Sequence, residues 1–282
     1  MNPVFGPVHS WRLGRALGVD MVASDRKYCS FDCVYCPGSK RTHGVTGRPW
    51  FVGMSALQAS LESHKNEAEF EADYVTFTGG GEPTLAGNLG QAIDLARSLL
   101  GLPVAVLTNS SLMPRDDVKR DLAKADIVVA KLDAPDEGLF RAINRPYVQY
   151  GLTEIVDALG DFRRSFQGRF VVQTTVVDAN RPRIHEVAAI VHGLSPDEVQ
   201  LNWRLPGWPG RAMADEVQKI LGAFADLNVK SPRTNGPSWE RLVDAVQMQR
   251  SGRQNAEVML MAAEAPMAAR PLGTGDATRL GR

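Results

Sequence analysis

The sequence predicts an α/β protein built around a parallel β-sheet, and two observations support this prediction. Six short runs rich in apolar residues lack strict polar alternation, which is typical of strands buried on both faces. Each run is followed by a longer stretch in which apolar residues recur with helical spacing. Repeated strand–helix units imply right-handed crossovers between parallel strands, as in an open doubly wound sheet or an incomplete barrel. Periodicity does not distinguish these two architectures.

The predicted elements follow one another from residue 16 to residue 227. Strands are expected at 16–24, 72–79, 103–110, 125–134, 169–179 and 198–207. Helices are expected at 55–70, 88–102, 115–125, 152–166, 181–194 and 213–227. Ser55 and Asn88 stand in N-cap positions, and Gly101 is a stop signal for the second helix. In both architectures ligands bind at the carboxyl ends of the strands, so a site is expected there.

The composition excludes several classes of protein. The 282 residues carry no net charge and are 44% apolar, which argues against disorder and against a chain-wide nucleic-acid charge signature. No apolar run approaches the ~20 residues that span a bilayer, and the N-terminus lacks the apolar core of a secretory signal. We therefore expect a cytoplasmic protein without membrane contact. The first 50 residues hold seven Lys or Arg against three Asp, which indicates either a solvated surface or attraction for an anionic ligand.

The strand–helix pattern fades after residue 230, and this sets the expected domain boundaries. Residues 1–232 are expected to form the main domain, and residues 233–262 a short C-terminal extension with one or two elements. The last stretch, 263–282, is rich in Pro, Gly and Ala without apolar periodicity, so we expect a flexible tail.

All three cysteines of the chain lie within eight residues, at Cys29, Cys33 and Cys36. Four explanations compete for this C-x3-C-x2-C spacing. Structural zinc needs four ligands, for which His43 is available, and a redox pair of Cys33 and Cys36 leaves Cys29 idle. Chance burial of three reduced cysteines does not explain the clustering. A [4Fe–4S] cluster normally takes four thiolates, so three would leave one iron open to bind a substrate or cofactor.

A run of three glycines follows the second predicted strand and ends at Glu82. Glycine lets the backbone approach a ligand closely, and Glu82 adds a carboxylate at the same strand end. No Gly-Lys-Ser/Thr follows, which excludes a P-loop, and the dinucleotide fingerprint G-x-G-x-x-G is not satisfied. An ordinary glycine turn is the alternative.

Polar residues also stand at the ends of the later strands. Asn109 ends the third strand, where polar residues are usually turn formers. Lys131 and Asp133 alternate with apolar residues in the fourth strand, so both side chains are expected on one face, paired with each other or with a ligand. Gln173 and Asn202, in the fifth and sixth strands, either line the ligand end of the sheet or occupy rim positions.

The cysteine spacing, the aromatic Tyr35 before the last cysteine and the Gly-Gly-Glu at the next strand end together resemble the radical S-adenosylmethionine (SAM) enzymes. The resemblance covers residues 4–230 and implies a partial (β/α)6 barrel of the TIM type. It implies that Cys29, Cys33 and Cys36 hold a [4Fe–4S] cluster. In that family the open iron binds SAM, and an electron from the cluster cleaves SAM to a 5′-deoxyadenosyl radical that abstracts hydrogen from the substrate.

The resemblance also implies roles for the other strand ends. Gly80, Gly81 and Glu82 match the motif that binds the SAM amino group. Lys131 and Asp133 match a strand that contacts the SAM carboxylate and ribose. The remaining cofactor-binding candidates are Tyr35, Asn109, Gln173 and Asn202.

Two stretches depart from, or extend, the family pattern. Ser110 replaces the glycine that often follows Thr-Asn in the family, so Asn109 is a modest match. Residues 140–146, Phe-Arg-Ala-Ile-Asn-Arg-Pro, resemble a stretch of several radical SAM enzymes with helix-capping and substrate-side roles.

The leader at residues 5–22 resembles a single-cluster subgroup related to the tRNA wyosine-base enzymes, whose leader reads Gly-Pro-Val-Pro-Ser-Arg-Arg-Leu-Gly. His9 and Trp11 depart from that leader. The wyosine enzymes use extra cysteines for a second cluster, and this chain has none. The pyruvate-formate-lyase activating enzymes, which act on a glycine of a partner protein, are the other similar group.

Three functions are therefore considered. The favoured one is a radical SAM enzyme that acts on a macromolecule, either an RNA base as in tRNA or a protein residue, with reduced flavodoxin or a ferredoxin-type protein as electron donor. The second is a radical SAM enzyme that acts on a small molecule. The third is a zinc-binding module without catalytic activity. The near-neutral charge argues mildly against RNA.

Overall fold

The computed structural model describes residues 2–24, 26–36, 42–45, 47–67, 70–204 and 214–231. The predicted extension at 233–262 and the predicted tail at 263–282 lie outside the described residues, so the domain boundaries stay a prediction. The end of the sixth predicted strand, from residue 205, also lies outside them.

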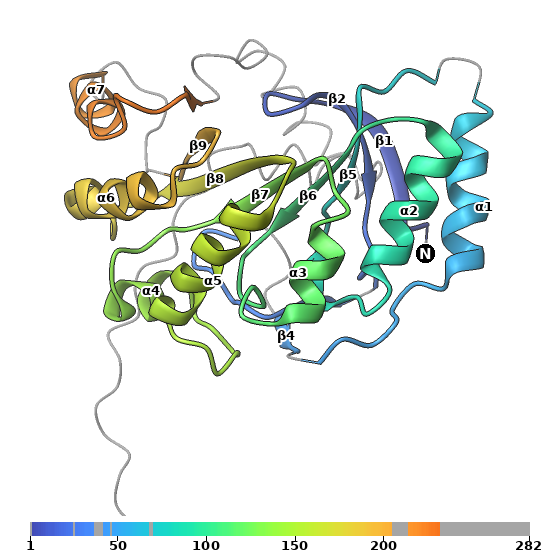
Figure 1. Ribbon diagram of the computed structural model, residues 1–282, viewed down its shortest axis with the longest axis horizontal. Helices are drawn as coiled ribbons and strands as arrows, with labels where there is room; N and C mark the ends of the chain where they lie inside the picture. Colours follow the sequence, from blue (N-terminus) through green and yellow to red (C-terminus); the bar gives the residue numbers. More distant parts are fainter. Residues whose placement is uncertain are drawn as a thin grey trace, which may run out of the picture.

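Eight strands of the described residues form one sheet, and their order identifies the architecture (Figure 1). The order is β1-β2-β5-β6-β7-β8-β9-β10, with β1 antiparallel to β2 and every other neighbouring pair parallel. The strands are β1 Val4–Ser10, β2 Gly14–Val19, β5 Tyr74–Phe77, β6 Val104–Thr108, β7 Ile127–Lys131, β8 Arg169–Val176, β9 Glu198–Trp203 and β10 Val229–Lys230. This order follows the chain, whereas a doubly wound sheet reverses direction part-way. The sheet is therefore an open, curled half-barrel, which confirms the predicted partial barrel.

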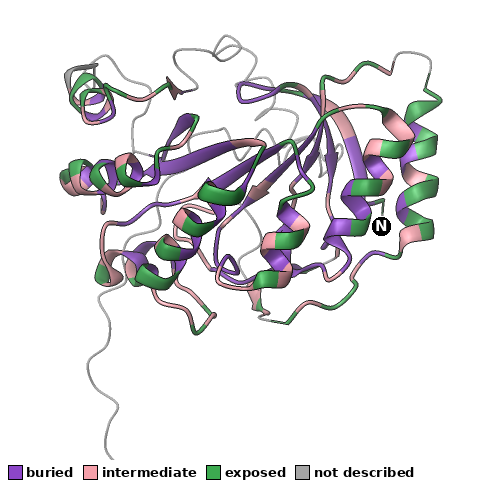
Figure 2. Ribbon diagram, viewed as in Figure 1, coloured by how far each residue is buried: buried purple, intermediate pink, exposed green. Residues whose placement is uncertain are grey.

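The helices lie along the outer face of this sheet, from α1 and α2 at the β1–β5 end to α6 beside β8 and β9 (Figure 1). They are α1 Met54–Lys65, α2 Leu89–Leu100, α3 Asp116–Leu122, α4 Glu137–Asn144, α5 Leu152–Ser165, α6 Ile184–Leu194 and α7 Ala214–Gly222. Two single 3-10 turns, Pro83–Leu85 and Arg181–Arg183, precede α2 and α6. In Figure 2 the strands are almost wholly buried, and the helices are exposed on the side away from the sheet.

The predicted helix ends are partly confirmed. Gly101 ends α2 in the left-handed conformation at φ 67°, and its N–H donates to the carbonyl of Arg97 at 2.9 Å. Asn88 is the N-cap residue of α2, but its side chain donates to the carbonyl of Val52 at 2.9 Å rather than capping the helix. Ser55 is not the N-cap of α1, because Gly53 occupies that position.

Several elements were not expected from the sequence. Strand β1 contains Gly6 and Pro7, which weaken a strand pattern but are tolerated at the edge of a sheet. Strands β3 (Lys27–Cys29) and β4 (Thr42–Gly44) form a separate two-stranded sheet around the cysteines. Helix α4 has only eight residues and is capped by Asp136, whose carboxylate accepts the N–H of Leu139 at 2.9 Å.

Successive side chains along each strand point to opposite faces of the sheet. Residues such as Val75, Val106 and Val128 belong to the large apolar core shared with the helices. The residues between them point into the concave side, where a smaller apolar cluster forms. This inner cluster consists of Leu13, Ala105, Ile127, Val129 and Val171. Leu13 belongs to the β1–β2 turn, so that turn reaches into the concave side.

None of the helices in the described ranges is long and apolar enough to cross a bilayer.

Candidate functional site

The concave side of the sheet holds a cavity of about 200 Å³. Ten of the twelve predicted site residues line it: Cys29, Cys33, Tyr35, Cys36, Gly81, Glu82, Asn109, Lys131, Gln173 and Asn202. The other two lie next to them: Gly80 adjoins Gly81 in the chain, and Asp133 accepts the hydroxyl of Tyr35. The structure thus brings together side chains from the cysteine loop and from the ends of β5 to β9.

The cysteine loop, residues 29–36, is fastened to the end of helix α4. The N–H of Asp32 donates to the carbonyl of Asn144 at 3.0 Å, and that of Val34 to the carbonyl of Ile143 at 2.9 Å. The last carbonyls of a helix have no partner within the helix, so they are free to accept these bonds. Within the loop, the N–H of Cys36 donates to the carbonyl of Cys33 at 3.0 Å. The C-terminal end of helix α4 therefore positions the cysteine loop.

The three thiols are free, and two of them accept a bond from a side-chain amide. Asn109 Nδ2 lies 3.5 Å from Cys29 Sγ, and Asn144 Nδ2 lies 3.5 Å from Cys33 Sγ. Burial raises the pKa of Cys29 to about 12 and that of Cys33 to about 11, because the thiolate loses its hydration. The thiolate forms therefore need a cation beside them.

Lys27 supplies part of that positive charge. It lies two residues before Cys29 on β3 and is 7% exposed. Burial alone would lower the pKa of Lys27, but the negative charge of Cys36 and Cys29 in their thiolate forms raises it overall, so the ammonium stays charged. Bound iron would supply the rest, and three clustered thiols with amide N–H donors are the environment that iron–sulfur clusters take. The residues present fit such a cluster.

His43, the fourth ligand considered for zinc, lies on β4 with its ring 5.7 Å from that of Tyr28. Within the described ranges, no three or more His, Cys, Asp or Glu residues converge so that they could hold one metal ion, whereas the thiolates of an iron–sulfur cluster bind separate irons.

The glycine run is held in place by Asp20, whose role was not predicted. One carboxylate oxygen of Asp20 accepts the N–H of Gly80 at 2.8 Å. A Cβ on Gly79 would lie 2.2 Å from Asp20 Cγ, and a Cβ on Gly81 would lie 1.9 Å from the carbonyl oxygen of Tyr28. Both positions therefore require glycine for close packing. Burial raises the pKa of Asp20, although its two backbone hydrogen bonds oppose the shift.

Glu82 presents a fully buried carboxylate to the cavity. It is 2% exposed and accepts four hydrogen bonds. One oxygen accepts the N–H of Thr84 at 3.0 Å and the hydroxyls of Thr84 and Thr108, each at 2.7 Å. The other accepts the N–H of Asn109 at 2.6 Å. Burial raises the pKa of Glu82, and these donors partly offset the shift by stabilising the charged form. The carboxylate is therefore fixed in position before any ligand binds.

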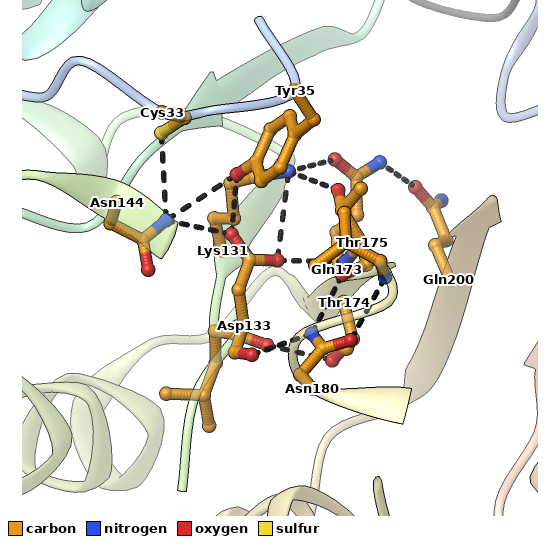
Figure 3. Close-up of polar contacts among 12 residues, drawn as sticks. Cys33, Tyr35, Lys131, Asp133, Asn144, Gln173, Thr174, Thr175, Asn180 and Gln200 are labelled. Atoms are coloured by element: carbon orange, nitrogen blue, oxygen red, sulfur yellow. Dashed lines mark hydrogen bonds and ion pairs between the residues drawn. The ribbon is translucent and has the colours of Figure 1, made fainter. Parts of the chain in front are cut away.

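Lys131 points into the cavity and is oriented by its neighbours on the sheet (Figure 3). Its Nζ donates to Thr175 Oγ1 at 2.7 Å and to Gln173 Oε1 at 3.3 Å. The predicted ion pair with Asp133 is long, at 3.9 Å. The ammonium also lies 4.9 Å from the centre of the Tyr35 ring. These contacts therefore hold the Lys131 ammonium in one position at the wall of the cavity.

Asp133 braces the cysteine loop against the sheet (Figure 3). Its Oδ1 accepts the N–H of Thr175 at 2.7 Å, and its Oδ2 accepts Asn144 Nδ2 at 2.9 Å and the hydroxyl of Tyr35. Burial and the Asp133 charge raise the pKa of Tyr35, so the phenol keeps its proton and donates it to this bond. Asp133 thus acts on the cavity through Tyr35 and Asn144.

Three further residues of the site could be found only in part from the sequence. Asn144 belongs to the predicted Phe-Arg-Ala-Ile-Asn-Arg-Pro stretch, but its side chain contacts Cys33 rather than capping a helix. Lys27 and Cys29 stand two apart, which is the signal for a shared face once β3 is known to be a strand. Asp20 is an acidic residue within an apolar run and is half-buried in the structure, and this unusual context is the signal that could have identified it.

Residues 26–188 match the family model described as the Radical SAM superfamily. The chain belongs to the radical SAM superfamily. Its members use SAM and an iron–sulfur cluster. The matched segment of this radical SAM chain carries the three cysteines, Glu82 and Lys131.

Two relatives place this radical SAM chain among the UPF0026 proteins. It is 34% identical over 206 residues to a UPF0026 protein of Methanocaldococcus jannaschii, which covers 72% of this chain and 63% of the relative. It is 36% identical over 202 residues to a UPF0026 protein of Synechocystis sp., which covers 71% of this chain and 74% of the relative. The chain thus spans less than two thirds of the first relative's length.

A solved structure supports the fold. Streptococcus suis SuiB bound to S-adenosylmethionine is similar with a TM-score of 0.54 at 15% identity, over 75% of this chain and 50% of SuiB. At that identity the likeness shows the fold alone. The resemblance of the leader to the tRNA wyosine-base and pyruvate-formate-lyase activating groups stays a prediction.

Proposed function

We propose that this chain is a radical SAM enzyme in which Cys29, Cys33 and Cys36 hold a [4Fe–4S] cluster, and that it abstracts hydrogen from a macromolecular substrate. One observation carries the proposal: a single cavity is lined by all three thiols and by the buried carboxylate of Glu82. When bound, the cluster would supply the electron that cleaves SAM to a 5′-deoxyadenosyl radical. The chain's own residues bind and orient the two cofactors.

The charged residues of the cavity suit the two ends of the methionine part of SAM. The carboxylate of Glu82 is held by four donors and would accept the SAM amino group. The ammonium of Lys131 would pair with the SAM carboxylate. Gly81 lets the glycine run pack directly against the carbonyl of Tyr28, which keeps Glu82 close to the cysteine loop. Asn109, Gln173 and Asn202 offer polar side chains in the same cavity for the remaining groups.

The hydrogen bonds of Asp133 give the cysteine loop a defined position. Asp133 links Tyr35, in the loop, to the sheet through Thr175, and it orients Asn144 toward Cys33. A catalytic geometry must be held closely by its supporting hydrogen bonds. We therefore assign Asp133 to positioning rather than to direct contact with SAM.

A macromolecular substrate is supported by the shape of the sheet. Among the described strands the sheet ends at β1 on one side and at β10 on the other, so it does not close into a full barrel. An open barrel leaves a side from which an RNA base or a protein residue can reach the cavity. A reduced flavodoxin or ferredoxin-type protein is the proposed electron donor, since the cluster needs a reductant.

The proposal is tested by anaerobic reconstitution with iron and sulfide, followed by SAM, dithionite and detection of 5′-deoxyadenosine by mass spectrometry. The wild-type protein is expected to hold iron and sulfide and to form the product above a no-protein control. Cys33→Ala is expected to do neither. Ser55→Ala, an equally small change at an exposed position of helix α1, is the control and should behave as the wild type.

The outcomes separate the candidate functions. Product from Cys33→Ala would show that the cysteine loop does not hold the reactive cluster. Bound zinc without iron or sulfide would favour the zinc-binding module. If product rises when a small-molecule fraction of a cell extract is added, and not with its RNA or protein fractions, the substrate is not a macromolecule.

A further inference from the structure

A row of polar side chains crosses the concave side of the sheet, starting at the cavity. Lys131 and Gln173 line the cavity, and in the sheet register Lys131 of β7 pairs with Gln173 of β8. Gln173 pairs in turn with Gln200 of β9, and Glu198 stands two residues before Gln200, so these side chains share one face. The polar row consists of Lys131, Gln173, Gln200 and Glu198. We propose that the polar row positions the Lys131 ammonium for the SAM carboxylate, an inference that rests on the proposed function.

Hydrogen bonds join the polar row from end to end in one direction. Lys131 Nζ donates to Gln173 Oε1 at 3.3 Å, and Gln173 Nε2 donates to Gln200 Oε1 at 3.5 Å (Figure 3). Gln200 Nε2 then donates to Glu198 Oε1 at 2.8 Å. The two ends determine this direction, because an ammonium has only N–H donors and an ionised carboxylate only accepts. Each amide must therefore turn its oxygen toward Lys131 and its NH2 group toward Glu198.

Glu198 is held at the far end of the row by two cations. Its other oxygen, Oε2, accepts Lys230 Nζ at 2.8 Å and a guanidinium N–H of Arg169. These charged donors occupy Oε2, so Oε1 is the oxygen that Gln200 contacts. Charge-assisted hydrogen bonds are stronger than neutral ones, and hydrogen bonds in a chain polarise one another. The carboxylate therefore keeps its orientation and imposes one orientation on both amides.

The polar row holds the Lys131 ammonium without cancelling its charge. Two of its three N–H groups donate to the neutral oxygens of Gln173 and Thr175. Among the described residues its one ion pair, with Asp133, is long at 3.9 Å. An ammonium in direct contact with a carboxylate would already be matched, whereas two neutral amides separate this one from Glu198. The Lys131 charge is therefore fixed in position and still able to attract the carboxylate of a ligand.

Gln200 and Glu198 act on the cavity only through their neighbours. Gln200 is 1% exposed and Glu198 is 0% exposed, so a ligand in the cavity does not touch them. Val171, the register partner of Glu198, belongs to the inner apolar cluster. A buried polar group that loses its hydrogen bond in such surroundings is costly, so the amides keep the orientation that satisfies them. Gln200 and Glu198 are therefore positioning residues.

Glu198→Gln tests the row, because it keeps the shape of the side chain and removes one acceptor. The remaining oxygen is expected to face the two cations, which are the stronger donors, so the NH2 group faces Gln200. Gln200 and then Gln173 would each have to turn over to keep their hydrogen bonds. An NH2 group, rather than an oxygen, would then face the Lys131 ammonium, and the ammonium would lose that contact.

The first measurement needs no cofactor. It follows the side-chain NH2 signals of Gln173 and Gln200 by NMR in cluster-free protein with 15N-labelled glutamine, and Glu198→Gln is expected to shift both. Thr174→Val is the matched control, because the buried Thr174 hydroxyl donates to the carbonyl of Leu132 at 2.8 Å, outside the polar row. This control should move the two signals less. Unchanged signals in Glu198→Gln would overturn the inference.

The second measurement is the Kd of SAM for the reconstituted protein, by anaerobic isothermal titration calorimetry without a reductant. Lys131→Met is expected to weaken binding about tenfold or more, and Glu198→Gln about threefold or more. In the double variant, Glu198→Gln should add less than about twofold to the effect of Lys131→Met, because it acts through that lysine. Thr174→Val should bind SAM as the wild type does. If Glu198→Gln does not fold, Gln200→Met interrupts the row elsewhere and should show the same dependence on Lys131.

The outcomes separate this inference from the proposed function. A loss of SAM binding in Lys131→Met with none in Glu198→Gln overturns the inference and leaves the proposed function intact. Full loss from Glu198→Gln on top of Lys131→Met shows general damage to the site and also overturns it. Unchanged SAM binding in Lys131→Met counts against the proposed SAM contact of Lys131, and the positioning role fails with it even if the glutamine signals shift.

Discussion

Replacing Gly81 with alanine tests how closely the glycine run packs against the strand that carries the first cysteine. A Cβ at this position would lie 1.9 Å from the carbonyl oxygen of Tyr28 and 2.7 Å from Val22 Cγ2, whereas real Cβ atoms essentially never approach closer than 3.0 Å. The two backbone segments would have to separate by at least 1.1 Å. That movement would also break the 3.3 Å bond from the N–H of Glu82 to the same carbonyl.

The free energy of unfolding lost in Gly81→Ala depends on which atom the added Cβ contacts. Overpacking typically destabilises by about 1–3 kcal/mol. The upper end is expected for Gly81→Ala, because a backbone carbonyl cannot rotate away as a side chain can. A loss of about 3 kcal/mol lowers the melting temperature of a domain of this size by roughly 6–12 °C. The assay is thermal unfolding of the cluster-free protein followed by circular dichroism.

The matched control is Gly47→Ala, because a Cβ on Gly47 would meet no atom within 4 Å. This variant should unfold close to the wild-type temperature. Since Tyr28 precedes Cys29 on β3, Gly81→Ala should also hold less iron after reconstitution. Equal melting temperatures for the two variants would refute the reasoning, because the contact with Tyr28 would then not constrain the loop.

Three further predictions concern the buried polar groups. In Glu82→Gln an NH2 group replaces one carboxylate oxygen, and since each oxygen accepts a backbone N–H, either orientation places the NH2 group against a backbone N–H donor. A loss of roughly 1–3 kcal/mol in the free energy of unfolding is expected by thermal unfolding, and unchanged stability would contradict it. Asn144→Leu removes the N–H donor to Cys33, so the reduction potential of the reconstituted cluster should fall by roughly 40 mV, measured by electron paramagnetic resonance titration; an equal potential would rule out this contact. Burial raises the pKa of Asp20 above 3.8, so the folded state binds this proton more tightly than the unfolded state. The stability that Asp20 contributes is therefore fully present below pH 3.8 and is lost as pH rises from 3.8 through the folded pKa. Over that pH range the melting temperature of Asp20→Asn should decrease less than that of the wild type.

Much of the fold follows from local patterns in the chain. The apolar runs that became β5, β6, β7, β8 and β9 are short and bounded by polar or glycine residues, which marks a strand whatever its neighbours are. Gly101 could be identified as a helix end because only glycine adopts its left-handed conformation without strain. Strand β1 could not be identified in this way, because its Gly6 and Pro7 are acceptable only at a sheet edge, which is a property of the assembled sheet.

The candidate site was predictable where a residue type is unusual in its local context. Three cysteines in eight residues and a glutamate after three glycines stand out without any knowledge of the fold. The partners of these residues do not stand out. Asn144 lies 111 residues from Cys33, and a single asparagine at the end of a short helix has no distinctive pattern. Its role exists only because the cysteine loop packs against the end of α4.

The sequence by itself determined the class of the fold, the clustering of three thiols in one loop and the strand ends that line the cavity. These features depend on residue type and on spacing along the chain. Only the tertiary structure decided that Asp133 turns to Tyr35 and Asn144, that Asp20 holds the glycine run, and that the end of α4 meets the cysteine loop. The physical reason is that such contacts join residues far apart in the chain, and packing of the whole sheet, rather than local propensity, determines which of them meet.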